Sequence, residues 1–178
     1  MHSLDTIKRI LSEPIVSSGL LVRESIVVSP PATPVQLETL GGSLPRQLSD
    51  FHRQLLLMWN GLDLEVVRFH GVPPARSGIR SLLDAQVLVP STHPSWIAVA
   101  SDPAGFLYAE DEHGWIWSLD HDGGAERRLV ASLDEFIGGY IFGQRGAEFG
   151  GESWLADLVT YGVLPAAKSA NLRRALPS

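Results

Sequence analysis

The chain of 178 residues is 44% apolar and 19% charged, carries a formal net charge of −6 and contains no cysteine. This composition is that of an ordinary globular protein with a sizeable core, and it excludes a collagen-like or strongly disordered chain. The lack of cysteine excludes disulfides, thiolate metal sites and cysteine nucleophiles. The acidic balance disfavours a general nucleic-acid binder, which needs clustered Lys and Arg. The sequence has no apolar run that could span a membrane and no secretion signal, so we expect a cytoplasmic protein.

The first third of the chain predicts two helices and a strand. Apolar residues recur at helical spacing over residues 4–12, and Pro14 ends that run. The β-branched segment that starts at Gly19 suits a strand. Thr33, with Pro34 and Gln36 after it, then predicts a capped helix start, because Thr and Gln at this spacing form a capping box. That helix is short, since Gly41-Gly42 ends it.

The clearest helix of the sequence is predicted from Pro45 to Asn60-Gly61. Its apolar stripe has spacings of three and four and contains Leu48, Phe51, Leu55, Met58 and Trp59, of which we expect all but Met58 to be buried. Residues 62–69 (LDLEVVRF) alternate as one strand would. Residues 79–89 (IRSLLDAQVLV) predict another short helix.

From Trp96 onward, short apolar segments alternate with tight turns. WIAVAS, FLYAE, WIWSLD and AERRLVA are separated by DPAG, DEHG and HDGG, whose Pro and Gly residues suit chain reversals. Strands joined by such short turns pair only antiparallel, so we expect a contiguous meander between residues 96 and 131. A capping box over residues 132–135 then opens a helix to about Phe142, and a Gly-rich link leads to a last helix over residues 153–161.

Acidic residues are concentrated on this meander. Residues 102–135 contain nine acidic and two basic residues, whereas the rest of the chain is close to neutral. We expect the turn acids to form one negative patch that faces a protein partner: Glu110, Asp111, Glu112, Asp120 and Asp122. The alternative is that these acids only keep the turns solvated.

The sequence contains no phosphate-binding loop, no GxSxG elbow and no HExxH motif. His113 and His121 lie near acids that could hold a hard metal, although the spacing matches no calcium loop. A carboxylate pair for acid–base chemistry is another alternative, but acids in solvated turns should all stay ionised. Trp115 and Trp117 share one strand face, either as exposed anchors for a partner or as part of the core. We predict no catalytic residue, no metal and no cofactor.

The order of these elements resembles the SUKH superfamily. SLPRQLSDFHRQLLLMWNG is similar to its opening signature, in which Leu-Pro leads into an amphipathic helix that ends in Asn-Gly. WIAVASDPAG, FLYAEDEHG, WIWSLD and SLDEFIGGYI follow in the family's order. The resemblance covers about residues 34–143, and the segments before and after have no counterpart in the family. The first turn departs from the family's pattern, because it reads Asp102-Pro103 where a Gly-Asp step is common.

The resemblance implies one α+β domain over residues 1–178, with helices packed on one side of an antiparallel meander and with N- and C-terminal additions. It also implies a binding protein. Bacterial members resemble immunity proteins that neutralise a cognate toxin, and fungal relatives are regulatory scaffolds in cell-wall synthesis. We therefore expect an immunity-type protein that is not an enzyme. Its partner would be a toxin, for example a nuclease, with no direct contact to nucleic acid or membrane. A regulatory scaffolding module and an enzyme with a carboxylate or His–carboxylate site are the alternatives.

Overall fold

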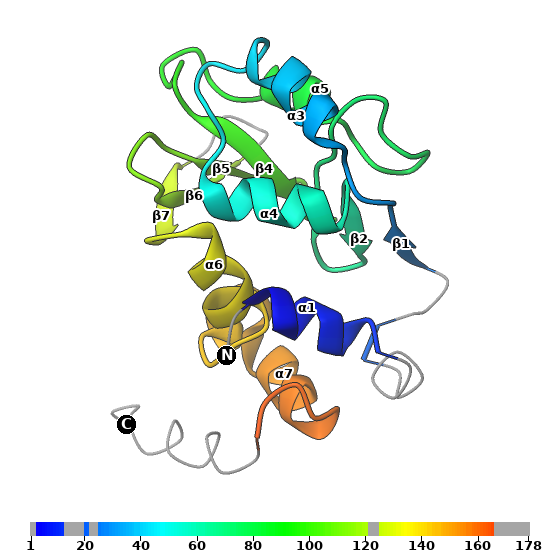
Figure 1. The fold of residues 1–178 in the computed structure, drawn as a ribbon. Coiled ribbons are helices and arrows are strands. Elements are labelled where there is room, and N and C mark those ends of the chain that lie inside the picture. The colour runs from blue at the N-terminus through cyan, green and yellow to red at the C-terminus, as the bar shows by residue number, and fades with distance from the viewer. Residues whose placement is uncertain (1–2, 13–19, 22–24, 121–124, 166–178) are drawn as a thin grey trace. The chain divides into compact units, whose positions relative to one another are not determined.

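The computed structural model describes residues 3–12, 20–21, 25–120 and 125–165 (Figure 1). The chain divides into two compact units. The smaller unit consists of Met1–Arg23 with Asp134–Ser178, and the larger unit is Glu24–Leu133. The single domain over residues 1–178 stays a prediction.

Within the described residues, the larger unit holds one seven-stranded sheet in which every strand pairs antiparallel with its neighbours. The order across the sheet is the order along the chain: β1 (Ile26–Val28), β2 (Leu62–Leu64), β3 (Arg68–Phe69), β4 (Ile97–Ser101), β5 (Leu107–Glu110), β6 (Ile116–Leu119) and β7 (Arg127–Val130). The strand order confirms the predicted meander as β4 to β7. The physical reason is that turns this short leave no room for a crossover connection. The fold class is α+β, as the sequence predicted.

Residues 62–69 form a hairpin, so the prediction of a single strand was wrong here. Leu62 pairs with Phe69 across the hairpin, and Glu65 reverses the chain with a positive φ of 67°. Asp63 stabilises the turn, because its Oδ1 accepts a hydrogen bond from the Glu65 amide at 2.8 Å and its Oδ2 accepts one from Arg68 Nε at 2.9 Å. The turn contains no Gly or Asn that would indicate it in the sequence. The side chain that stabilises it, Asp63, belongs to β2.

Three helices of the larger unit were predicted at about the right places: α3 (Pro34–Gly41), α4 (Asp50–Met58) and α5 (Leu82–Gln86). The capping box of α3 is confirmed, because the Gln36 amide donates to Thr33 Oγ1 at 3.2 Å and the Thr33 amide donates to Gln36 Oε1 at 2.8 Å. The predicted start of α4 at Pro45 was wrong. Ser49 is the N-cap of α4, since its Oγ accepts a hydrogen bond from the His52 amide.

Two apolar clusters form the core of the larger unit. The first joins α3, α4 and α5 to β4: Ala32, Leu37, Leu40, Leu44, Leu48, Leu56, Val72, Leu82 and Ile97. The second joins α5 to β4, β5 and β6: Ala85, Trp96, Ala98, Leu107, Ala109 and Leu119. Ile97 and Ala98 are successive residues of β4 and lie in different clusters, so both faces of this strand are covered. In Figure 1, α4 lies across the strands of the sheet.

The buried face of α4 agrees only in part with the predicted stripe. Leu55 is buried as expected, whereas Phe51 and Trp59 are half-buried. His52 and Leu56 complete the buried face instead. The stripe is displaced because a histidine, which counts as polar in a hydrophobic pattern, occupies the middle of the inner face.

Leu56→Ala should lower the free energy of unfolding of the larger unit by about 2–5 kcal/mol, because it removes a fully buried side chain from the first cluster. Leu57→Ala is the matched control on the same helix. Leu57 is 39% exposed, so its truncation should cost less than about 1 kcal/mol. Urea unfolding followed by circular dichroism measures both. Equal losses for the two variants would contradict the orientation of α4, and Phe51→Ala should fall between them.

The smaller unit packs α1 (Ser3–Ile10) and α7 (Gly146–Thr160) against the π-helical segment η2 (Phe136–Ile141). The helix predicted after residue 132 is confirmed as α6 (Leu133–Glu135), which continues into η2. The amide of Ser3 donates to Asp134 Oδ1 at 3.2 Å, which ties the start of α1 to α6. The last helix, predicted over residues 153–161, corresponds to the part of α7 after a break at Gly151, where φ is 80°. The helical part from Gly146 to that break was not predicted.

Candidate protein-binding surface

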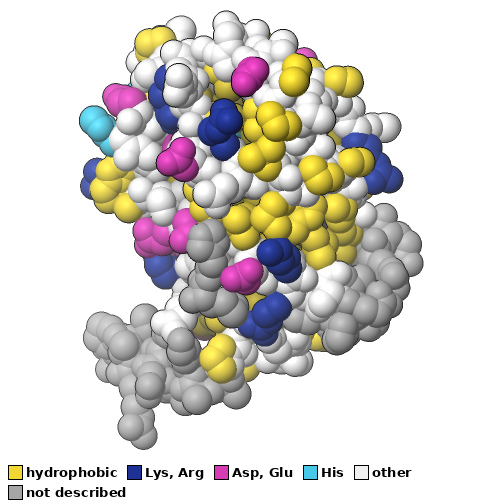
Figure 2. Space-filling model, viewed as in Figure 1, with side chains coloured by type: hydrophobic (Ala, Val, Ile, Leu, Met, Phe, Trp, Pro, Cys, Tyr) yellow, Lys and Arg dark blue, Asp and Glu magenta, His cyan; other side chains and the backbone are white. Residues whose placement is uncertain are grey.

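The structure separates the five acidic residues of the predicted patch. Glu110, Asp111 and Glu112 lie where β5 turns into β6, whereas Asp120 follows β6 at its other end. Asp122 lies outside the described residues. Consecutive turns of an antiparallel meander lie at opposite ends of the strands, so the described acids do not form one patch. Acidic and basic side chains are also interspersed on the face that Figure 2 shows. The role of these acids in partner binding stays a prediction.

Two of these acids are buried. Glu110 is 2% exposed and Asp111 is 6% exposed, so the expectation of solvated turn acids was wrong for this pair. Glu110 pairs with Ile97 and Ile116 in the sheet, on the face that α4 covers. Burial raises the pKa of Glu110 above its ordinary value, although hydrogen bonding to Ser49 and the charge of Arg46 act in the opposite direction.

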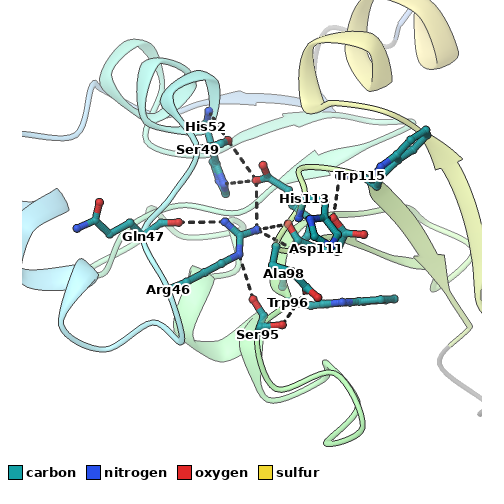
Figure 3. A network of polar contacts seen from close by, with 12 residues as sticks. Arg46, Gln47, Ser49, His52, Ser95, Trp96, Ala98, Asp111, His113 and Trp115 are labelled. Carbon is teal, nitrogen blue, oxygen red and sulfur yellow. Dashed lines mark hydrogen bonds and ion pairs between the residues drawn. The ribbon is translucent and has the colours of Figure 1, made fainter.

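Arg46 connects three segments of the larger unit (Figure 3). Its Nη2 donates to the carbonyl oxygens of Glu110 at 2.9 Å and Asp111 at 2.7 Å, at the end of β5. Its Nε donates to the carbonyl oxygen of Ser95 at 3.1 Å, just before β4, and its Nη1 donates to that of Gln47 at 3.0 Å. Nη2 also lies 3.9 Å from Glu110 Oε2. One guanidinium therefore fixes the loop before α4, the start of β4 and the β5–β6 turn together.

Asp111 organises the β5–β6 turn from inside. Its Oδ1 accepts hydrogen bonds from the amides of His113 at 2.8 Å and Trp115 at 2.9 Å, and its Oδ2 accepts one from Trp117 Nε1 at 2.9 Å. Gly114 has a φ of 86°, which the reversal requires and which a residue with a Cβ rarely adopts. These bonds hold the turn in one conformation, so its outward side chains are presented at fixed positions.

Four side chains form the outer part of this region, which we call the turn surface: Glu112, His113, Trp115 and Arg128. Glu112 and His113 are exposed, and Trp115 is half-buried. The guanidinium carbon of Arg128 lies 4.4 Å from the centre of the Trp115 ring, a cation–π contact. Glu112 Oε2 accepts a hydrogen bond from Ser95 Oγ at 2.8 Å. Hydrogen bonds from its own amide and from Ser95 hold the pKa of Glu112 below its ordinary value, so this acid is charged at neutral pH.

The two tryptophans of β6 and its turn have different surroundings. Trp117 packs against the second cluster, with its ring 4.9 Å from that of Trp96, and Trp96 in turn stacks on His93 at 3.8 Å. Trp115 has Arg128 over its ring instead. Trp117 is therefore partly a core residue, whereas Trp115 is one of the side chains of the turn surface.

Sequence reasoning missed Arg46, Ser49 and His52 as parts of this site. Ser49 Oγ donates to Glu110 Oε2 at 3.2 Å, and His52 Nδ1 lies 3.9 Å from the same oxygen. The backbone partners of Arg46 before β4 and after β5 are 49 to 65 residues away in the sequence. No local pattern relates an arginine to such distant groups.

The described residues contain no group of three or more His, Asp or Glu side chains that could hold a metal ion. His113 is exposed at one end of β6, and His121 lies outside the described residues. Two of the acids that the carboxylate-pair alternative could use are not accessible to a substrate. Glu110 is buried under α4, and both oxygens of Asp111 accept hydrogen bonds within the turn, so neither acid is presented to a substrate.

Comparison of the chain with models of protein families and with curated proteins gives no match. In the part of the chain that the structure describes, no helix has the length and apolar character to cross a membrane.

Proposed function

We propose that this protein is an immunity-type binding protein of the SUKH kind, which neutralises a cognate bacterial toxin by direct contact in the cytoplasm of the cell that makes both. The observation that carries the proposal is the turn surface. It presents an acid, a histidine, and a tryptophan with an arginine over its ring, on a turn that Asp111 and Arg46 hold from inside. Trp and Arg are the residue types that most often dominate binding energy at protein interfaces. A turn that is already ordered also loses little entropy on binding.

The order of elements that suggested the family also supports this proposal. The helix α4, the strands β4 to β6 and the helix α6 occur along the chain in the order that the resemblance implied, and β7 lies between β6 and α6. The carboxyl groups of Glu110 and Asp111 accept hydrogen bonds inside the unit, so Glu112 is the acid of this turn that a partner can contact. If the partner is a nuclease, its basic cleft attracts this exposed carboxylate and the association rate rises accordingly.

Where a toxin gene lies beside the gene of this protein, the test uses its purified toxin domain. Trp115→Ala should weaken binding by about 30-fold or more, as expected for a central interface tryptophan. Glu112→Lys should slow association several-fold at low salt and reduce its salt dependence, because the charge attraction is lost. Glu38→Lys is the matched control, since it makes the same charge reversal on an exposed position of α3. Stopped-flow mixing gives the association rates, and calorimetry gives the affinities.

Two outcomes distinguish the immunity function from the role of the turn surface. A wild-type chain that neither binds the toxin domain nor restores growth of cells that express it would rule out the immunity function and favour a scaffolding module. Tight binding that Trp115→Ala and Glu112→Lys leave unchanged would keep the function but remove the turn surface. Circular dichroism of each variant shows that a loss of binding is not a loss of fold.

A further inference from the structure

Two histidines of the larger unit are buried without a hydrogen-bonding protein partner for either ring nitrogen. His52 lies in α4 and is 0% exposed, and His70 follows β3 and is 1% exposed. Buried polar groups are nearly always hydrogen-bonded, and an imidazolium at His52 has no direct acceptor, whereas the backbone of Ala100 favours a proton on His70 in part. Both rings are therefore accommodated as neutral groups, and a proton on either is costly.

The charged groups around His52 come from several elements. Arg46 precedes α4, Glu110 ends β5, and His70 follows β3. The charges of Arg46 and His70 act on His52, and the charge of Arg46 also acts on Glu110. Glu110 Oε2 is 3.9 Å from His52 Nδ1 and also 3.9 Å from Arg46 Nη2. That distance is too long for a hydrogen bond, so Glu110 offsets too little of the cost of a buried proton on His52 to keep the pKa of the ring from being lowered. Asp111 is directed to the turn amides, and Arg80 acts on His70.

Burial lowers the pKa of both rings. With the charges of His70 and Arg46 adding to burial, the pKa of His52 falls from its ordinary 6.5 to about 3. Burial and the charge of Arg80 lower the pKa of His70 to about 4, although hydrogen bonding to the backbone of Ala100 acts in the opposite direction. As the pH falls below 6.5, the unfolded chain takes up these two protons and the folded chain does not, so unfolding is favoured. Glu110 acts in the opposite sense, because its raised pKa lets the folded chain bind a proton earlier than the unfolded chain.

We propose that His52 and His70 form an acid-sensitive switch, in which protonation separates α4 from the end of β5 and so dismantles the β5–β6 turn. The connection runs through three contacts. The His52 amide donates to Ser49 Oγ, the Ser49 hydroxyl donates to Glu110, and Arg46 binds the carbonyl oxygens of Glu110 and Asp111. When α4 moves away, this support of the turn is lost, and the turn surface loses its fixed shape. The switch does not rest on the proposed partner.

The experiment measures urea unfolding of the full chain between pH 7.5 and 4.5. In the range from about pH 5.5 to 4.5, each buried histidine makes the unfolding equilibrium constant rise about tenfold per pH unit. The His52→Gln variant takes up one proton fewer on unfolding. For each unit by which the pH falls, the increase in its unfolding equilibrium constant should therefore be about tenfold smaller than that of the wild type. Leu56→Ala is the control: it destabilises the same helix contact and should keep the wild-type pH slope. His52→Leu is the second variant if glutamine prevents folding.

Nuclear magnetic resonance gives an independent reading on the wild type. The His52 ring signals should not titrate in the folded chain between pH 7.5 and 4.5, and the Trp117 indole N–H signal should disappear together with the amide signals of α4 on acidification. A His52→Gln slope equal to that of the wild type, or a folded His52 that titrates near its ordinary pKa, would overturn the proposal. An indole signal that survives the loss of α4 would disprove the coupling to the turn.

Discussion

Replacing Asp111 with alanine should lower the free energy of unfolding of the larger unit by about 3–5 kcal/mol. The carboxylate, which is 6% exposed, accepts hydrogen bonds from two backbone amides and from the Trp117 indole, and its loss leaves these three donors without their acceptor. An unsatisfied buried donor costs about 1–3 kcal/mol, and bonds to a charged acceptor are among the stronger ones. The cost is less than a full sum, because the two turn residues are partly accessible to solvent.

Asp111→Asn separates the three bonds. An amide oxygen at Oδ1 can still accept from His113 and Trp115, whereas the amide nitrogen would meet the Trp117 indole donor with a donor of its own. We therefore expect about half the loss of Asp111→Ala. Glu38→Ala, at an exposed position of α3, should change stability by less than about 0.5 kcal/mol. Urea unfolding measures all three, and a loss below about 1 kcal/mol for Asp111→Ala would contradict the arrangement of the turn.

The burial of Asp111 also changes the meaning of a charge-reversal experiment that the sequence suggests. Reversal of Asp111, Glu112 and Asp122 to Lys would be the direct test of the acidic patch that the sequence predicts, if all three were exposed on solvated turns. With Asp111 inside the turn, that variant should unfold the turn before it tests any partner. The single change Glu112→Lys keeps the internal bonds and is the sharper probe of charge.

Arg46→Ala should destabilise the larger unit by about 3–5 kcal/mol, because it leaves the buried carboxylate of Glu110 without its cation and removes four hydrogen bonds to backbone carbonyls. The Arg46 side chain is 21% exposed, so solvent screens the charge only in part. Arg46→Lys keeps the charge and loses the planar fork, and it should recover only part of the stability.

The control for Arg46 is Arg53→Ala, which removes an exposed arginine from α4 and should cost less than about 0.5 kcal/mol. The double variant Arg46→Ala with Glu110→Gln removes the orphaned charge as well. It should be more stable than Arg46→Ala alone, and the difference from additivity measures the coupling of the two side chains. If Arg46→Ala is as mild as Arg53→Ala in urea unfolding, the three-segment contact is not formed in solution.

The sequence by itself determined the elements whose causes lie within a few residues. The capping box of Thr33 and Gln36 requires only four adjacent positions, and Gly114 marks its own turn. The meander from β4 to β7 follows in the same way, because a short turn forces an antiparallel partner whatever the rest of the chain does. The α+β class was therefore predictable from residues 96 to 131 and the helices before them.

Tertiary structure alone decided which polar residues are inside. His52 and Glu110 face each other because α4 packs across the sheet, and hydrophobic patterns count both as surface residues. The opposite placement of Asp120 and Glu112 at the two ends of β6, by contrast, already follows from the predicted meander, because its consecutive turns lie at opposite strand ends. Arg46 reaches carbonyl groups up to 65 residues away. Such contacts depend on the packing of whole elements, whereas sequence patterns report only on neighbours along the chain.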